Sequence, residues 1–135
     1  MYEVGASDTV TAWHVMPGTE GPEGELHSHD YRIDVVVARE ELDDQGMVCD
    51  LDVLRAGLAG AIARVRDQNL EIIQPDDADA VTVEIFARWL HDQLHAALRG
   101  ASNDALLSVR VWETPEAFGG YAAAIGSPRV ASSSS

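Results

Sequence analysis

LHSHDYRIDVVV, residues 26–37, is the stretch that decides the fold, because it joins two histidines to a run of strand-forming residues. Side chains i and i+2 of a strand project from the same face, so His27 and His29 lie side by side on the predicted strand. The continuous apolar run at 35–37 indicates a strand that is covered on both faces. We therefore predict a long strand over residues 27–39 with two imidazoles at its start.

A third histidine, His14, lies near the end of an earlier strand-like stretch, residues 8–16. Three neutral imidazoles that converge from neighbouring strands suit Zn²⁺ and leave a fourth coordination position for water or substrate. An open position points to catalysis rather than to a structural metal. The sequence thus predicts a zinc site formed by His14, His27 and His29.

The remaining two histidines, His91 and His95, form a competing pair. They are four residues apart, so a helix places them on one face. That face also carries Arg88 and lies opposite the apolar positions of the same segment. We interpret this face as solvent-exposed rather than as a metal site.

Hydrophobic periodicity and capping residues predict the other elements. In chain order they are a loose start at 1–7, a loop at 17–25, a turn at 40–46 with a short strand at 47–49, a helix at 51–66 capped by Asp50, a connection at 69–80, a helix at 83–99 capped by Thr82 and ended by Gly100, a strand at 106–113 and a short strand at 120–125.

This order predicts an α+β fold in which two helices, inserted between strands two and three, lie on one face of an antiparallel four-stranded sheet. Such a sheet has two unpaired edges, and unpaired edges invite pairing between subunits, so we expect a homo-oligomer. Residues 1–125 are expected to form a single domain, and residues 126–135 a disordered serine-rich tail.

Composition excludes several classes of function. The formal net charge is −14, and all nine basic residues are arginine, so the chain lacks the basic patches that nucleic acids or anionic lipids require. We find no apolar run long enough to span a bilayer and no signal peptide. The single cysteine, Cys49, excludes an internal disulfide and fits a reducing cytoplasm. The sequence favours a cytoplasmic protein that acts on a small molecule.

Four carboxylates lie near the predicted histidine site or at the ends of elements. Glu23 and Glu25 are either solvated loop residues or the source of a general base beside the metal, a role that requires partial burial because the ordinary pKa is about 4.3. Glu84 suits the first turn of a helix. Glu113 ends an apolar strand, where it has no evident structural role. Two such carboxylates can accept hydrogen bonds from the N–H edge of a heterocycle.

Five motifs of the chain occur in the order and spacing of a known enzyme family. They are His14, Glu23-x-x-x-His27-x-His29, Gly46-Met47-Val48-x-Asp50, Thr82-x-Glu84 and Glu113-Thr114. Over about residues 8–124 the chain thereby resembles the 6-pyruvoyl-tetrahydropterin synthase and 6-carboxytetrahydropterin synthase family.

The resemblance implies the tunnelling fold, in which subunits join their sheets into barrels, commonly trimers that stack as hexamers, with active sites between subunits. It implies a catalytic zinc on the three histidines, Glu113 as the anchor of the pterin ring, and Thr82 and Glu84 as further ring-binding residues.

The chain departs from the family pattern at the proton-transfer residues. Glu23 occupies the position of the usual cysteine, a substitution found in relatives thought to cleave the dihydroneopterin side chain by retro-aldol chemistry. The family's Asp-His pair falls on Arg66-Asp67, with no histidine nearby, and Ser28 replaces the usual central glycine. We expect Glu23 to be the general base and Asp67 of a neighbouring subunit to be a second acid–base group.

These observations leave three functions open. The first is a zinc-dependent lyase or cyclase that acts on the side chain of a pterin or pterin-like substrate. The second is the same zinc chemistry on a non-pterin substrate of specialised metabolism. The third is a non-catalytic protein that binds a pterin or a metal.

Overall fold

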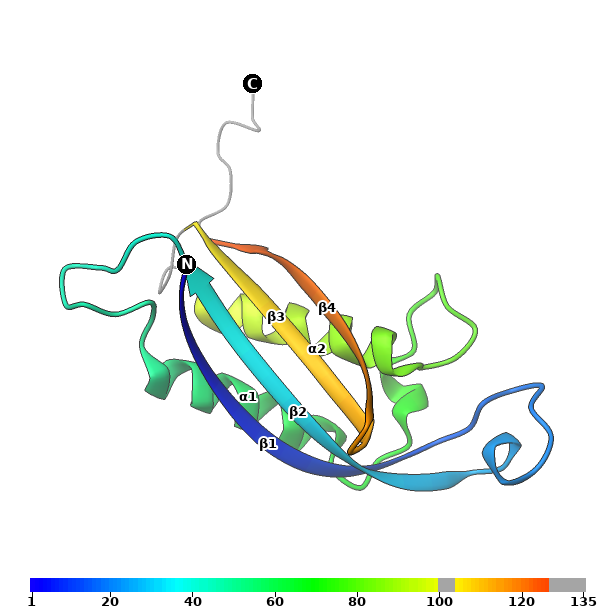
Figure 1. Ribbon diagram of the computed structural model, residues 1–135. Coiled ribbons are helices and arrows are strands. Elements are labelled where there is room, and N and C mark those ends of the chain that lie inside the picture. The colour runs from blue at the N-terminus through cyan, green and yellow to red at the C-terminus, as the bar shows by residue number, and fades with distance from the viewer. Residues whose placement is uncertain (100–103, 127–135) are drawn as a thin grey trace.

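The computed structural model describes residues 1–99 and 104–126 and has the predicted α+β order (Figure 1). Its elements are β1 (Tyr2–His14), the 3₁₀ helix η1 (Pro22–Gly24), β2 (His27–Arg39), α1 (Leu51–Val65), the 3₁₀ helix η2 (Leu70–Ile73), α2 (Val83–Leu98), β3 (Ala105–Thr114) and β4 (Ala117–Ile125). The observed bounds agree with the predicted ones to within a residue or so for β2, α1, α2 and β3.

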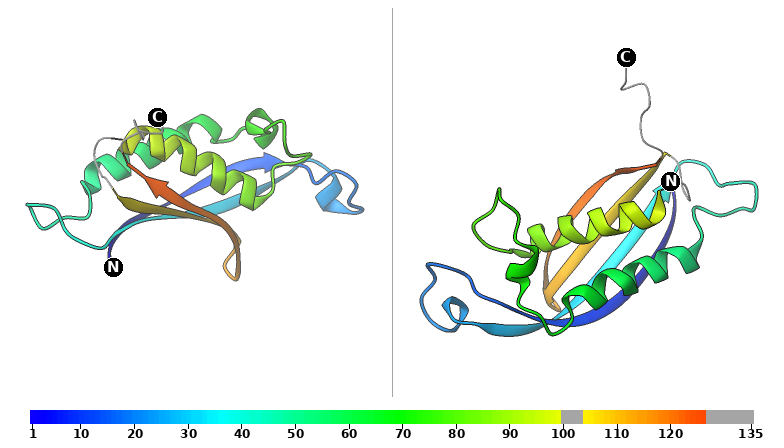
Figure 2. Two further views of the ribbon diagram at one scale, coloured as in Figure 1. Left: turned by 90° about the horizontal axis from the view of Figure 1, so that it is seen from above. Right: turned by 180° about the vertical axis from the view of Figure 1, so that it is seen from behind.

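The four strands form one antiparallel sheet in the order β1-β2-β3-β4, and both long helices cover the same face of it (Figure 2). The hydrophobic core fills the space between the helices and the sheet. Four alternate residues of β2 point into this core and are at most 1% exposed: Tyr31, Ile33, Val35 and Val37. The buried side of β2 therefore continues the face on which His27 and His29 lie.

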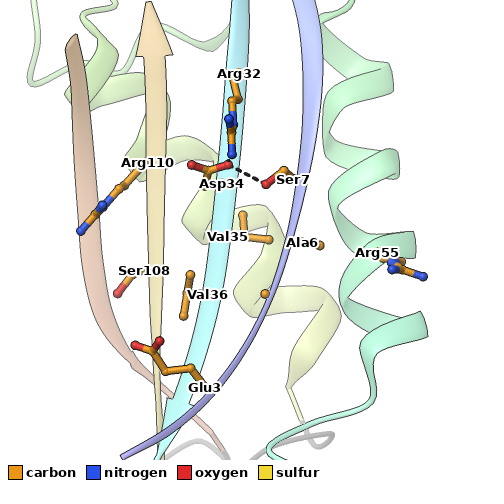
Figure 3. A pocket seen from close by; sticks show the side chains of 11 residues that line it. Glu3, Ala6, Ser7, Arg32, Asp34, Val35, Val36, Arg55, Ser108 and Arg110 are labelled. Carbon is orange, nitrogen blue, oxygen red and sulfur yellow. Dashed lines mark hydrogen bonds and ion pairs between the residues drawn. The ribbon is translucent and has the colours of Figure 1, made fainter. Parts of the chain in front are cut away.

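The opposite face of the sheet carries polar side chains around a shallow pocket of about 610 Å³ (Figure 3). Asp34 lines this pocket and accepts hydrogen bonds from Ser7 Oγ at 2.6 Å and from Trp112 Nε1 at 2.8 Å. Arg32 donates to the same carboxylate at 3.0 Å. Burial alone would raise the pKa of Asp34, but these hydrogen bonds outweigh it and lower the pKa below its ordinary value.

Both edge strands are longer than predicted. Residues 1–7 were expected to be loose, but β1 begins at Tyr2, because residues 2–7 pair with residues 34–39 of β2. This part of β1 is mostly exposed, so its sequence shows little of the hydrophobic alternation that predicts a strand. Its strand structure comes from backbone pairing with β2. β4 likewise begins at Ala117 rather than at 120, since a tight turn returns the chain directly alongside β3.

The two predicted helix caps are confirmed. Asp50 accepts a hydrogen bond from the backbone N–H of Asp52 at 2.9 Å, and Thr82 Oγ1 accepts one from the N–H of Ile85 at 3.2 Å. Each side chain satisfies one of the N–H groups that the first turn of a helix leaves unpaired. The predicted cap at Gly100 and the serine-rich segment beyond Gly126 lie outside the described residues.

Two connections differ from the prediction. Residues 47–49 do not form a strand, because the Asp43 carboxylate accepts from the backbone N–H groups of Gln45 and Met47 and closes this segment into a turn. The connection at 69–80 contains η2, whose first turn is capped by the side chain of Asn69.

Candidate metal and substrate site

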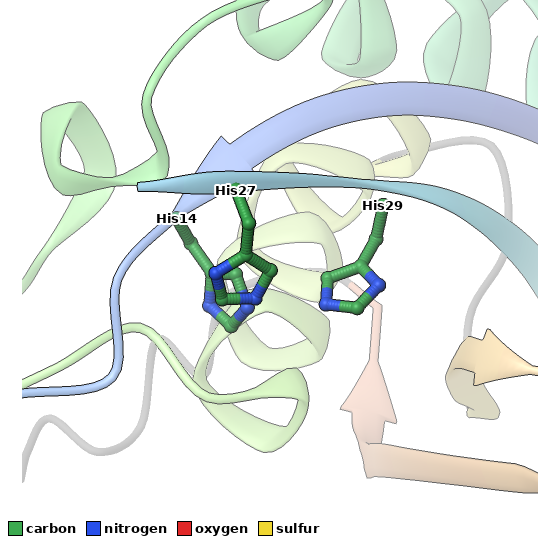
Figure 4. A group of neighbouring side chains, drawn as sticks. All are labelled: His14, His27 and His29. Atoms are coloured by element: carbon green, nitrogen blue, oxygen red, sulfur yellow. The ribbon is translucent and has the colours of Figure 1, made fainter. Parts of the chain in front are cut away.

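Three histidines meet at the end of the sheet where β1 finishes and β2 begins (Figure 4). His14 and His27 are direct cross-strand partners, and His29 lies two residues further along β2 on the same face. Their ring centroids are 4.5, 4.8 and 5.2 Å apart, and one ring nitrogen from each lies within 4.8 Å of the other two. The structure thus brings together the three residues that the sequence predicts to be metal ligands.

The ring nitrogens of this cluster are buried and have few polar neighbours. Nε2 of His27 and Nε2 of His29 are buried and make no hydrogen bond among the described residues, and the buried ring of His14 faces the backbone of Val81. Leaving a buried polar atom unpaired costs about 1–3 kcal/mol. One cation held among the three rings would satisfy a nitrogen of each, so this donor set fits a metal ion, and imidazole nitrogens suit Zn²⁺.

Two of the rings are prepared to act as neutral ligands. The Nδ1–H of His27 donates to the backbone carbonyl of Glu25 at 2.7 Å, which leaves the lone pair on Nε2. Burial, with the neighbouring His27 and His29, lowers the pKa of His14 below its ordinary value, so that His14 is neutral near pH 7.

Glu113 and Tyr31 complete this end of the core. Glu113 Oε1 lies 3.2 Å from His29 Nε2 without hydrogen-bond geometry, and its side chain is about one-third exposed. Tyr31 is buried beneath the histidines, with its ring centroid 5.6 Å from that of His29 and 6.4 Å from that of His14. Burial and the Glu113 carboxylate raise the pKa of the Tyr31 phenol.

Tyr31 is not among the site residues predicted from the sequence. The signal was available, since Tyr31 continues the alternation of His27 and His29 along one face of β2. An aromatic residue at that position was indistinguishable from ordinary core.

The two ring-binding candidates on α2 lie at its first turn. Thr82 caps the helix, and its neighbour Val81 shares a small cavity with His14, so α2 begins beside the histidine cluster. Glu84 is exposed and lies against Gly119 of β4. Among the described residues, no hydrogen bond or ion pair joins Glu84 to Glu113, so the structure places these two carboxylates on neighbouring elements without linking them.

Glu23 lies in η1, within the loop that joins β1 to β2. Its backbone carbonyl accepts from the N–H of Met16 at 2.9 Å, which fixes the loop against the end of β1. The Glu23 side chain is exposed, and within residues 1–99 and 104–126 its carboxylate makes no polar contact. Glu23 is therefore close to the histidines in the sequence, but within the described part of this chain its side chain does not contact them.

Asp67 lies on the outer edge of β1. It has the left-handed backbone conformation, with φ of 57°, that aspartate tolerates better than most residues. Its N–H donates to the carbonyl of Thr11 at 2.8 Å, and the N–H of Trp13 donates to the carbonyl of Gln68 at 2.9 Å. The exposed Asp67 side chain therefore lies beside the last residues of β1, whose outer edge is hydrogen-bonded to residues 67 and 68, and outside the histidine cluster of its own chain.

The interpretation of His91 as solvent-exposed is wrong. Its side chain is buried, and Nε2 lies 3.2 Å from the backbone carbonyl of Ala123 in β4. The helix packs against β4 as well as β3, so the buried stripe of α2 is wider than its aliphatic residues indicate. His95, one turn further on, is half-buried.

A family model described as 6-pyruvoyl tetrahydropterin synthase matches residues 3–124. The chain belongs to this family. The curated 6-carboxy-5,6,7,8-tetrahydropterin synthase of Bacillus subtilis (strain 168) is 28% identical over 120 residues, which cover 87% of this chain and 82% of that protein. The predicted family membership is thereby confirmed.

Solved members of the family share the fold. The 6-pyruvoyl tetrahydropterin synthase of Caenorhabditis elegans has a TM-score of 0.66 at 21% identity, covering 91% of this chain and 96% of its own. A catalytic-residue mutant of the Plasmodium vivax enzyme, with glutamate replaced by alanine, has a TM-score of 0.74 at 14% identity, covering 92% and 98%. The chain therefore has the α+β architecture of the tunnelling fold. Neither helix in the described part of the chain has the length and apolarity needed to cross a bilayer.

Proposed function

We propose that the protein is a zinc-dependent lyase or cyclase that acts on the side chain of a pterin or pterin-like substrate. The observation that carries this proposal is the cluster of three histidines, in which one ring nitrogen of each lies within 4.8 Å of the other two. Membership of a family named for a pterin-converting enzyme supports the substrate class.

His14, His27 and His29 would hold the metal. Bound there, Zn²⁺ supplies a Lewis acid that can polarise a hydroxyl or carbonyl oxygen of the substrate. The His27 contact with the Glu25 carbonyl keeps the Nε2 lone pair available, and the apolar surroundings of His14 keep that ring neutral.

Glu23 is the general base of this proposal. It takes a proton from the substrate side chain next to the polarised oxygen and returns it to the product, a transfer that typically contributes about 10²–10⁴-fold to the rate. The loop position of Glu23 between β1 and β2 supports this role, because the loop starts and ends at zinc-ligand candidates. The P. vivax relative also has a glutamate as a catalytic residue.

Glu113 is the ring anchor of this proposal. A carboxylate at the edge of the cluster can accept two parallel N–H bonds from the amidine-like edge of a pterin, which fixes the ring while its side chain reaches the histidines. The one-third exposure of Glu113 supports access from solvent. Thr82 and Glu84, at the start of α2, contribute further contacts to the ring.

The active unit is proposed to be a homo-oligomer, a trimer or a stacked hexamer, in which sheets join edge to edge. The unpaired edges of β1 and β4 support such joining. In this assembly Asp67, at the outer edge of β1, reaches the site of a neighbouring subunit and acts as the second acid–base group.

One observation favours a different substrate for the same chemistry. Asp67 stands where relatives carry the histidine of the Asp-His pair, and no other histidine lies in that segment. A substrate that needs a different second proton-transfer group would account for the change. Failure of the protein to bind or convert dihydroneopterin triphosphate, together with metal-dependent turnover of another carbonyl or polyol compound, would support this second candidate.

The decisive experiment compares Glu23→Gln with Glu25→Gln. Both replace an exposed loop carboxylate by its neutral isostere, and only Glu23 is the proposed base. We expect Glu23→Gln to lower kcat by about 10²-fold or more while zinc content stays at the wild-type level. Glu25→Gln should retain turnover, because only the backbone carbonyl of Glu25 contacts His27. Unchanged kcat in Glu23→Gln removes the proposed role of this residue. Absence of bound metal in the wild-type protein removes the zinc mechanism.

A further inference from the structure

We propose that a metal ion in the histidine cluster releases Glu113 from His29, so that the metal-loaded protein binds the ring of a pterin more tightly than the metal-free protein does. This inference rests on the proposed function, in which Glu113 anchors the ring and the three strand histidines hold the metal. It goes beyond that function because it couples the two binding events through one contact.

The Glu113 carboxylate is paired with His29. Its Oε1 lies 3.2 Å from Nε2 of His29, and within residues 1–99 and 104–126 it makes no other ion pair and no hydrogen bond. The contact is partly shielded from water, since the side chains of His29 and Glu113 are 24% and 35% exposed. Two parallel N–H bonds from a ring need both oxygens of a carboxylate. A ring that binds Glu113 in this way therefore has to displace His29.

The nitrogen of His29 that faces Glu113 is also a candidate metal ligand. Nε2 is buried, and the ring of His29 directs a nitrogen toward the rings of His14 and His27 (Figure 4). A ring nitrogen either offers its lone pair to a metal or directs an N–H toward a carboxylate, and it cannot do both. A metal ion on Nε2 thereby removes the group that holds Glu113 against the histidine.

Glu113 has another position available. The pairing of β3 with β4 passes over it, with Trp112 opposite Phe118 and Thr114 opposite Ala117. Such irregularities commonly re-aim a side chain beside a site. Glu113 also lines a hollow of about 340 Å³ together with Trp112 and Thr114. The released carboxylate therefore has open space in which to meet a planar ring.

The expected size of the effect follows from coupling between two sites. In the metal-free protein, ring binding has to break the contact between Glu113 and His29, whereas in the metal-loaded protein this contact is already broken. Couplings between binding sites typically change affinity by about 5–150-fold and are reciprocal. We expect zinc to raise the affinity for the ring by about fivefold or more, and the ring to raise the affinity for zinc by the same factor.

The test measures the equilibrium affinity of the full-length protein for a pterin without a C6 side chain. This probe keeps the N–H edge of the ring and lacks the side-chain oxygens that the metal would polarise. Its fluorescence reports binding to protein that has been freed of metal by a chelator or loaded with zinc. The comparison of these two forms of the wild type requires no substitution.

Two histidine variants test the role of the contact itself. Metal-free His29→Ala should bind the ring about fivefold or more tightly than metal-free wild type, because Glu113 has lost its partner. His27→Ala is the matched control, since His27 lies on the same face of β2 and contacts the carbonyl of Glu25 instead of Glu113. Its metal-free form should bind the ring as the metal-free wild type does. Circular dichroism checks that both variants are folded, and the wild-type comparison decides the matter if His29→Ala is not.

The outcomes separate this inference from the proposed function. Equal affinity of the wild type with and without zinc overturns the coupling and leaves the proposed function in place. A zinc-dependent gain that persists in Glu113→Gln also overturns it, since the ring then responds to the metal without Glu113. Absence of ring binding in both forms removes the anchor role of Glu113, and with it both this inference and the proposed substrate class.

Discussion

Replacing Gly119 by alanine should destabilise the protein because the start of α2 lies directly against this glycine. A Cβ at position 119 would lie 2.5 Å from Val83 Cγ2 and 3.1 Å from the backbone N of Glu84. Carbon atoms in favourable contact are about 3.5–4.0 Å apart, so the overlap with Val83 is about 1 Å. Rotation of Val83 relieves only part of it, since the second contact is with backbone.

The expected size follows from this overlap. Overpacking of this kind costs about 1–3 kcal/mol, which for a domain of this length lowers Tm by roughly 4 °C per kcal/mol, or about 4–12 °C. Thermal unfolding followed by circular dichroism measures the change. In a Val83→Ala background the methyl that clashes is absent, and Gly119→Ala should then cost about 1 kcal/mol less, a coupling that a double-mutant cycle detects.

Gly60→Ala is the control for this experiment. A Cβ at Gly60, on the exposed face of α1, meets no atom within 4 Å. Its substitution should stabilise the protein by up to about 1 kcal/mol through helix propensity alone. An unchanged Tm in Gly119→Ala, or the same cost with and without Val83, would refute the close packing of α2 on β4.

Two further predictions concern hydrogen bonds seen in the fold. Thr82→Ala removes the cap that accepts from the N–H of Ile85 and should cost about 1 kcal/mol in urea unfolding, whereas Thr82→Ser should retain most of it; equal midpoints for the two variants would contradict the capping role. Asp34 has a lowered pKa in the folded chain, so its stabilising contribution is present above its ordinary pKa of 3.8 and is lost as pH falls through the folded value. Asp34→Asn should therefore reduce the loss of Tm between about pH 5 and pH 3, and an identical pH dependence in both proteins would exclude this contribution.

The sequence predicted those parts of the fold in which local pattern and tertiary packing agree. The alternation and apolar run of β2 fixed its bounds and the face on which His27 and His29 lie, and the caps Asp50 and Thr82 fixed where the long helices begin. The first half of β1 was missed because its residues are mostly exposed and its strand structure depends on pairing with a segment about 30 residues away.

The candidate site was predictable in its residues and less so in its contacts. His14 meets His27 through the strand register, which follows from the antiparallel pairing of neighbouring strands. The burial of His91 was predictable from helix periodicity, because His91 lies three residues before Leu94 and seven before Leu98 and so shares their face of α2. It was missed because the polar character of histidine was given more weight than its position. The exposure of Glu23 was not predictable, because Glu23 lies in a loop and loop residues show no hydrophobic periodicity.

The backbone hydrogen bonds of Asp67 with Thr11 and of Gln68 with Trp13 limit where another copy of this chain can pair with β1. They occupy the outward-facing backbone groups of β1 over its last few residues, so a strand from another copy can extend the sheet only along the earlier part, about residues 2–9. An incoming strand is thereby stopped short of the histidines, and the carboxylate of Asp67 stands at the point where it stops. In the proposed homo-oligomer, these few hydrogen bonds would limit the length of β1 that is open to pairing and would present Asp67 at the end of that length.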